Sequence, residues 1–235
     1  MRYEWLAITA VVCALTSVSA SAPTSSASPQ VMPAAPVEHV NLEGEDYVIV
    51  APEHFCTSSL VGEAVRGQLE AVIGASVNAI WVGCDFVPTQ PKTLVFGFVA
   101  VKPTPVDTKT SRAAVLKQMS ALMQTSQGAA LIHQGVEEGK SRASDAGVPT
   151  PTISSEPRLV GVDDNALYFI ASGGAPSALG TKGVFIVEAI TFVKGRLVLL
   201  AFGQVDPSAD AQSDLVNKAK AEARRIVAAN EALPA

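Results

Sequence analysis

Glu188 is the residue of this sequence whose surroundings set it apart chemically. It falls in the middle of the apolar run VFIVEAITFV, with Ile186 and Ile190 two positions away on either side. A carboxyl group buried among such side chains must be paired, hydrogen-bonded or protonated. Pairing within the fold is the ordinary outcome, and a ligand role or a place at the rim of a pocket is the alternative. Glu188 is therefore the candidate binding residue.

Cys56 and Cys84 form the second candidate pair, and the remaining cysteine, Cys13, lies in an apolar N-terminal stretch. If Cys13 is removed with a signal peptide, an even number remains, which favours a disulfide in an oxidising compartment. Cys56 is expected between the first strand and a helix, and Cys84 near the end of the second strand. A β-α-β unit can bring such positions together. Two buried free thiols are the alternative.

Residues suited to catalysis form no recognisable constellation. The sequence contains no G-x-S-x-G pentad, and its one mid-chain histidine, His133, falls in an expected helix. The segment GAPSALGTK at 174–182 has five residues between its glycines and Thr before Lys, so it does not match a phosphate loop. Glu38-His39 and Glu53-His54 flank one strand, whose ends lie far apart, whereas zinc prefers closely spaced ligands. We expect no catalytic residue, no metal and no cofactor.

Composition and charge narrow the range of partners. The chain has 235 residues, of which 48% are hydrophobic and 17% charged, and its net charge is −5. This composition is typical of a globular protein. Nucleic acids and anionic lipid surfaces select clustered Lys and Arg, which the sequence lacks. We expect no nucleic-acid partner; an envelope protein or a small ligand is the expected partner.

Residues 1–20 are typical of an export signal. Arg2 precedes an apolar stretch, and the small residues Val18-Ser19-Ala20 predict cleavage after Ala20. The apolar stretch is shorter than the roughly 20 residues of a spanning helix, so we expect no transmembrane span in the mature chain. The protein is then periplasmic or extracellular. A lipoprotein acylated at Cys13 is the alternative.

The rest of the chain divides into a tether and a domain. Residues 21–36 are rich in Ser, Ala and Pro and are expected to be a disordered tether. Residues 37–235 are enough for a single domain with one good hydrophobic core. Within it, 139–157 is expected to be a loop with three prolines, and 173–183 a glycine-rich loop.

A β-hairpin is expected to hold Glu188. Val184–Val193 and Arg196–Gln204 are apolar runs joined by Lys194-Gly195, which fits a tight turn because Gly tolerates a positive φ. Both faces of this hairpin are mainly apolar, so helices must cover both sides of the sheet. The expected cross-strand pairs are Val193 with Arg196, Ile190 with Leu199, and Glu188 with Ala201.

One of the covering helices follows directly in the chain. Asp206-Pro207 fits a helix start, and an apolar stripe at helical spacing runs through about 208–230. Lys218, Lys220 and Glu222 are expected to lie mostly off that stripe. With two earlier helical segments, the element order predicts an α+β fold: a mainly antiparallel sheet of about six to seven strands with helices on both faces, a three-layer sandwich.

Three segments carry a resemblance to a known family. They are YVIVAP at 47–52, EAITFVKGRLVLLAF at 188–202 and LVNKAKAEARRIVAAN at 215–230. In their order and pattern, the chain resembles the PsbP-like α/β/α fold family, which includes photosystem extrinsic proteins and DcrB-like bacterial envelope proteins. The resemblance implies an accessory or assembly role without catalysis, and it assigns no functional residue.

Two functions follow from these observations as expectations. The first is an exported, non-enzymatic envelope accessory or binding protein of unknown ligand. The alternative is a secreted hydrolase whose catalytic residues are scattered along the chain. A cleft that gathers Glu188, His133 and a serine would favour the hydrolase, and an apolar groove would favour binding.

Overall fold

The structure is a computed structural model that describes residues 37–42, 44–57, 59–85, 94–105, 110–148, 152–177, 180–208 and 210–231. The expected signal segment with Cys13 and the expected tether lie outside these ranges. Within them the chain forms four helices, a seven-stranded sheet and a two-stranded sheet, and every strand pair is antiparallel. The predicted α+β fold is confirmed. No described helix has the length and apolarity needed to cross a membrane.

Groups of two to four strands are separated by one or two helices, and a helix follows the last four strands. In chain order they are β1 (Val37–Leu42), β2 (Glu45–Val50), β3 (Phe55–Thr57), α1 (Ser59–Ile73), β4 (Ser76–Gly83), β5 (Val95–Pro105), α2 (Arg112–Met123), α3 (Ser126–Asp145), β6 (Thr152–Val162), β7 (Leu167–Ser177), β8 (Gly180–Val193), β9 (Arg196–Val205) and α4 (Ala211–Glu231).

The predicted hairpin is the pair β8–β9, at the centre of the large sheet. The strand order is β3-β4-β5-β9-β8-β7-β6. Lys194 and Gly195 both take positive φ values, 48° and 70°, as a tight turn compatible with strand twist requires. The register confirms the predicted pairs: Val193 with Arg196, Ile190 with Leu199, and Glu188 with Ala201.

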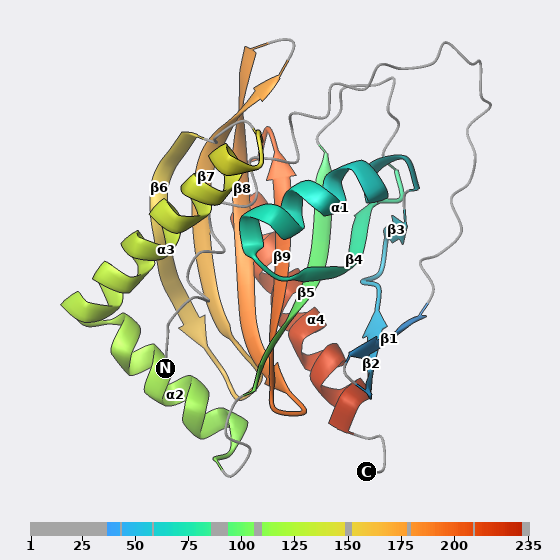
Figure 1. The fold of residues 1–235 in the computed structure, drawn as a ribbon, viewed down its shortest axis with the longest axis vertical. Coiled ribbons are helices and arrows are strands. Elements are labelled where there is room, and N and C mark those ends of the chain that lie inside the picture. The colour runs from blue at the N-terminus through green and yellow to red at the C-terminus, as the bar shows by residue number, and fades with distance from the viewer. Residues whose placement is uncertain are drawn as a thin grey trace.

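The sheet lies between two covers, and Figure 1 shows α1, α2 and α3 on one face with α4 on the other. Side chains alternate along β8, so Ile186 and Ile190 enter the core under α1–α3 while Val187 and Ala189 enter the core under α4. The small sheet β1–β2 adds Tyr47 and Ile49 to the α4 side. Each face is buried, which explains why both faces of the hairpin are apolar.

The segment 139–157 is not the long loop that its prolines predict. α3 continues to Asp145, and β6 begins at Thr152. Ala143 is buried, and the Arg142 side chain donates to the carbonyl of Ile73 at the end of α1 over 3.2 Å. Packing against α1 therefore holds the last turns of α3, which the sequence of small polar residues does not reveal.

Two further expectations are wrong at their boundaries. The glycine-rich segment 173–183 is largely strand, because β7 runs to Ser177 and β8 starts at Gly180. α4 begins at Ala211 and not after Asp206. Asp206 takes a φ of 51°, and its N–H donates to the carbonyl of Gly183 over 2.8 Å. Asp206 is therefore hydrogen-bonded to the end of the sheet and does not begin α4.

Candidate functional site

Glu188 lies near the middle of β8, on the sheet face that α1, α2 and α3 cover. Its cross-strand partners are Phe169 on β7 and Ala201 on β9. Phe169, Ala201, Ile186 and Ile190 all belong to the hydrophobic core of this face. The position is fixed by the turn of the β8–β9 hairpin, because a shift of one residue would move Glu188 to the opposite face.

The Glu188 carboxyl group is buried in this core. Only 3% of the residue is exposed, and Oε1 has no hydrogen-bond partner. Burial raises the pKa of Glu188 to about 8, and no charged group among the described residues lowers it. At neutral pH the carboxyl is therefore mostly protonated. The sequence analysis expected the Glu188 carboxyl group to be paired within the fold. No such pairing is observed in the described part of the chain.

Small residues line the inner side of α3, the helix that crosses β6 and β7 on this face (Figure 1). Gly135, Gly139 and Ala143 recur every four residues and are buried, so they share one helix face. Ile132 and Val136 are buried on the same helix and fill the space beside these small residues.

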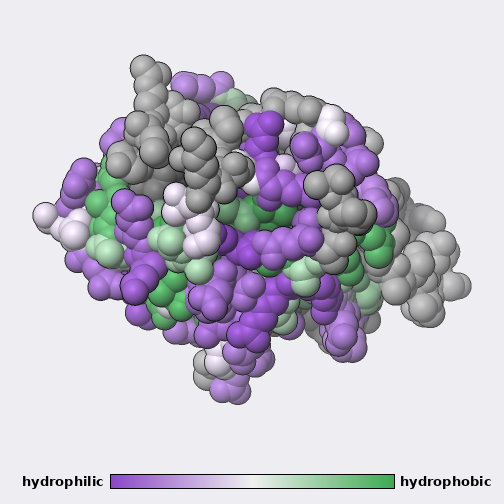
Figure 2. Space-filling model, turned by 90° about the horizontal axis from the view of Figure 1, so that it is seen from below, coloured by the Kyte–Doolittle hydropathy of each residue, from purple (hydrophilic) through white to green (hydrophobic). Residues whose placement is uncertain are grey.

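Apolar side chains border the same layer at its partly exposed positions. They come from α2, α3 and β6 and include Met119, Leu122, Leu131 and Leu159. Figure 2 looks at the end of the molecule where β8 and β9 turn and shows hydrophobic surface recessed between hydrophilic side chains. Apolar surface is therefore within reach of solvent at this end.

His133 does not join Glu188. Its side chain on α3 is 61% exposed, and Nδ1 lies 2.9 Å from Oε1 of Glu156, a side chain that is 62% exposed. The two residues form a solvent-exposed contact between α3 and β6. Because His133 is on the outer surface and Glu188 is in the core, the structure does not bring these two residues together.

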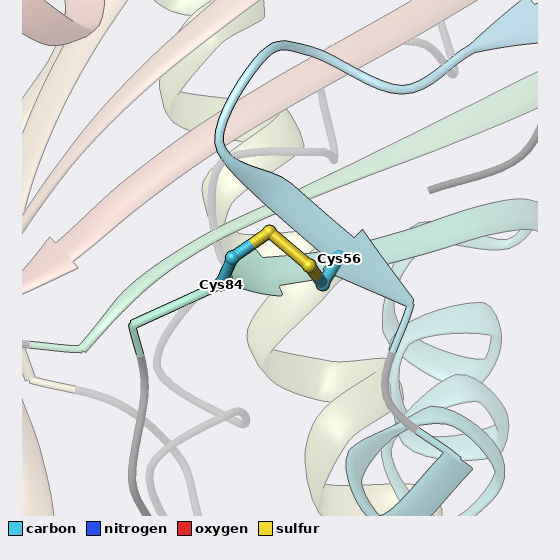
Figure 3. The surroundings of a disulfide bond; sticks show 2 residues. All are labelled: Cys56 and Cys84. Atoms are coloured by element: carbon cyan, nitrogen blue, oxygen red, sulfur yellow. A yellow bond between two sulfur atoms is a disulfide. The ribbon is translucent and has the colours of Figure 1, made fainter. Parts of the chain in front are cut away.

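Cys56 and Cys84 lie side by side, as Figure 3 shows. Their sulfur atoms are 2.03 Å apart and their Cα atoms 5.0 Å apart. Cys56 is in the short edge strand β3, opposite Val82 of β4, and Cys84 follows the end of β4. The N–H of Cys84 also donates to the carbonyl of His54 over 2.9 Å. The chain is thus positioned for a bridge that closes the loop containing α1.

Glu222 is a buried carboxyl group that the sequence reading misplaced. It lies on the inner side of α4 and is 1% exposed. Burial raises its pKa to about 7, and Arg225 opposes that shift. Arg225 Nη1 lies 3.3 Å from Glu222 Oε2, yet neither Glu222 oxygen accepts a hydrogen bond. Nη1 donates to the carbonyl of Ala51 over 3.1 Å.

The position of Glu222 could have been found from spacing alone. It comes three residues after Ala219 and four before Ile226, both of which belong to the apolar stripe of α4. Because Glu222 is charged, the sequence analysis expected it on the outer side of the helix. Its spacing from Ala219 and Ile226 places it on the buried side of α4. Glu222 faces the core on the α4 side of the sheet, and Glu188 faces the opposite core.

No group of three or more His, Cys, Asp or Glu side chains in the described ranges is arranged to hold a metal ion.

Tyr168 has a hydroxyl group that donates to both oxygens of Asp163, at 3.1 and 3.0 Å. Asp163 also accepts from the backbone N–H groups of Asn165 and Ala166. This cluster stabilises the turn between β6 and β7.

Comparison with known proteins finds no matching family model and no matching curated protein. Solved structures that match include LpqN of Mycobacterium tuberculosis, described as involved in cell envelope biogenesis, with 10% identity, a TM-score of 0.35 and coverage of 78% of this chain and 79% of that chain. A point mutant of the protein Mog1 matches with 12% identity, a TM-score of 0.29 and coverage of 83% of this chain and 93% of that chain.

The Ran-binding protein Mog1p of Saccharomyces cerevisiae matches with 12% identity, a TM-score of 0.26 and coverage of 84% of this chain and 93% of that chain. TM-scores this low mean that the backbones agree only loosely. Membership of the PsbP-like fold family therefore stays a prediction.

Proposed function

We propose that this chain is an exported, non-enzymatic accessory protein of the cell envelope that binds a ligand or a partner protein. The observation that carries the binding role is the Glu188 carboxyl group, buried in an apolar core with no partner for Oε1. An unpaired buried polar group costs free energy, and proteins depart from complete pairing mainly at functional sites. A binding role gives this group its missing partner.

The export part of the proposal is supported by the cysteine pair. Cys56 and Cys84 are positioned at bonding distance, and structural disulfides persist in oxidising compartments such as the periplasm or the extracellular space. Cleavage after Ala20 and a periplasmic or extracellular location belong to this proposal. The lipoprotein form, acylated at Cys13, is its alternative.

The secreted hydrolase has no specific observation in its favour. It required Glu188, His133 and a serine to meet in one cleft, and His133 lies on the exposed side of α3. We therefore propose the binding role alone.

The test begins with the protein expressed in full and recovered by fractionation. N-terminal sequencing of the exported form should give Ser21 as the first residue. Native mass spectrometry of the same sample should show a one-to-one adduct or complex that disappears on denaturation. Recovery only in the cytosol with the leader intact would overturn the export proposal. A native mass equal to the bare chain, together with no complex after crosslinking in the envelope, would overturn the binding role.

A further inference from the structure

Side chains cap the strand edges of this protein at two places. β3 pairs only with the last residues of β4, and the backbone of Val77 near the start of β4 bonds to α1 instead. The N–H of Val77 donates to Oε1 of Glu70 over 2.9 Å, and its carbonyl accepts from Nη1 of Arg66. Asn230 of α4 bonds in the same way to both backbone groups of Val48 in β2. Backbone groups occupied in this way cannot pair with another chain.

β1 has no such cap within the described residues. It pairs with β2 in an unbroken register, from Val37 opposite Val50 to Leu42 opposite Glu45, and it contains no proline. In the described part of the chain, no strand other than β2 pairs with β1, and no loop is hydrogen-bonded to its backbone. Alternate residues of an edge strand point their N–H and C=O groups away from the neighbouring strand, where they are free to bind a further one.

We propose that β1 accepts an extended, basic segment of a partner protein as an antiparallel third strand of the β1–β2 sheet. The proposal rests on the binding role proposed above and names the surface and the kind of partner. A free strand edge selects an extended chain, because another strand can satisfy its row of N–H and C=O groups. These backbone bonds provide affinity, and the side chains that alternate along the added strand provide specificity.

The side chains of this sheet determine which segment fits. β1 and β2 carry Glu38, Glu45 and Asp46 and no lysine or arginine, so a basic segment complements them. Glu38 and Val40 lie on the same face of β1, and Val40 packs against the core on the α4 side. The best segment therefore has an aliphatic residue opposite Val40 and, two positions further on, a basic residue opposite Glu38.

Two cations approach this sheet without pairing with its carboxyl groups. The charge of Arg66 acts on Glu38, but the Arg66 guanidinium group donates to the carbonyl of Val77. The Lys194 ammonium group donates to the backbone carbonyl of Asp46. Among the described residues, neither cation forms a salt bridge with a carboxyl group of β1 or β2. These carboxyl groups therefore remain available to a basic partner.

The acetylated peptide amide VTVTKT has the required pattern and is the probe. In an NMR titration of the exported protein, it should shift the amide signals of Val37–Leu42 more than those of β6 and slow their hydrogen exchange. Two N-methylated isomers of the peptide, each methylated at alternate residues along one edge, have the same composition and charge. One should bind at least about tenfold more weakly, because it lacks the N–H groups that face β1. The other should bind within about threefold of the parent peptide, because its methyl groups face solvent.

A charge exchange tests the acidic residue of β1. Glu38→Lys should weaken the binding of VTVTKT about fivefold and strengthen the binding of VTVTET, in which glutamate replaces lysine. Asp145→Lys makes the same change in net charge at an exposed position at the end of α3. This control variant should leave the affinities for both peptides unchanged.

Equal affinities of the two N-methylated isomers, or no shift in β1 with the parent peptide, would overturn the proposal even if Glu38→Lys failed to fold. A dimer in analytical ultracentrifugation with β1 amides already protected from exchange would overturn it too, because a second copy would then occupy the edge. If crosslinking in the envelope finds a partner but the peptide does not bind, the binding role stands and this surface is wrong. Isomer-specific peptide binding without any envelope partner would support the edge and contradict the binding role.

Discussion

Glu188 makes the folded state sensitive to pH at the level of a single residue. Its pKa is raised from 4.5 to about 8 by burial, so the folded protein binds more protons than the unfolded chain between these values. The contribution of Glu188 to stability is therefore fully present below pH 4.5 and is lost as pH rises through about 8. This direction is opposite to that of an ion-paired carboxylate.

The prediction is that Glu188→Gln removes this pH dependence. The free energy of unfolding of the wild type, measured by urea titration, should fall relative to the variant between pH 5 and pH 8.5, by about 1.4 kcal/mol for each unit of pKa shift realised. Glu45→Gln is a suitable control, because Glu45 is an exposed residue of β2 and its substitution leaves the buried carboxyl group in place. Parallel curves for the wild type and Glu188→Gln would show that the carboxyl group is solvated in solution.

At the scale of elements, the α4 residue Asn230 ties the helix to the small sheet by hydrogen bonds. The Asn230 side-chain oxygen accepts from the N–H of Val48 over 2.8 Å, and its amide nitrogen donates to the carbonyl of Val48 over 2.8 Å. Asn230 is 2% exposed. It thus completes the hydrogen bonding of β2 as a neighbouring strand would, and Arg225 adds a bond to the carbonyl of Ala51.

We expect Asn230→Ala to lower the free energy of unfolding by about 1–3 kcal/mol, since both groups of Val48 lose their partner. Hydrogen exchange at the Val48 amide should accelerate more than exchange in β8. Asn217→Ala on the exposed side of α4 is the control and should change stability by less than about 0.5 kcal/mol. Unchanged exchange at Val48 would contradict the role given to Asn230.

We expect α4 as a whole to be required for the sheet to fold. Leu215, Ile226 and Val227 pack in the same core as Val198 and Leu200 of β9. A chain that ends at Asp206 would expose this face. Each large aliphatic side chain contributes roughly 1.5–3 kcal/mol when buried, against a net stability of about 5–15 kcal/mol for a domain.

The truncated protein should therefore be insoluble or lack a cooperative thermal transition, as measured by circular dichroism. A shorter deletion that removes only residues 232–235 is the control, and it should melt like the full chain because it leaves α4 entire. A soluble chain ending at Asp206 with an unchanged melting curve would show that α4 is dispensable.

At the edges of the large sheet, the two end strands are protected in different ways. β6 pairs with β7 through three register irregularities and contains Pro157, features that prevent an edge strand from pairing with another chain. β3 is only three residues long and lies next to the cysteine pair. These features disfavour extension of the sheet by another chain.

At the scale of the whole molecule, the prediction concerns the bridge between Cys56 and Cys84. The exported, non-reduced protein should show no alkylatable thiol from this pair when it is denatured without reductant and analysed by mass spectrometry. Reduction should lower the free energy of unfolding by about 2–4 kcal/mol, because the bond constrains the unfolded chain. The sequence separation of 28 residues spans the whole of α1.

The control is the Cys56→Ser, Cys84→Ser double variant, whose stability should be insensitive to reductant. Two alkylated cysteines in the unreduced exported protein would show that the pair consists of free thiols. In that case the support that the pair gives to export would be lost as well.

The sequence alone determined the features that depend on local patterns. The turn at Lys194-Gly195 sets the register of β8 and β9, and period-two alternation of apolar residues then assigns both faces, including the face of Glu188. Helical spacing placed α4, and two apolar faces required covers on both sides of the sheet. These features follow from backbone geometry over a few residues, which is why they could be read without the fold.

Only the tertiary structure decided what depends on contacts between distant segments. The extension of α3 to Asp145 and the position of Asp206 just after β9 each rest on bonds to remote residues. The same holds for the site: the sequence predicted a buried Glu188 but not that Oε1 lacks a partner. Whether a carboxyl group finds a donor depends on which side chains the helices bring over it, and no local pattern specifies that.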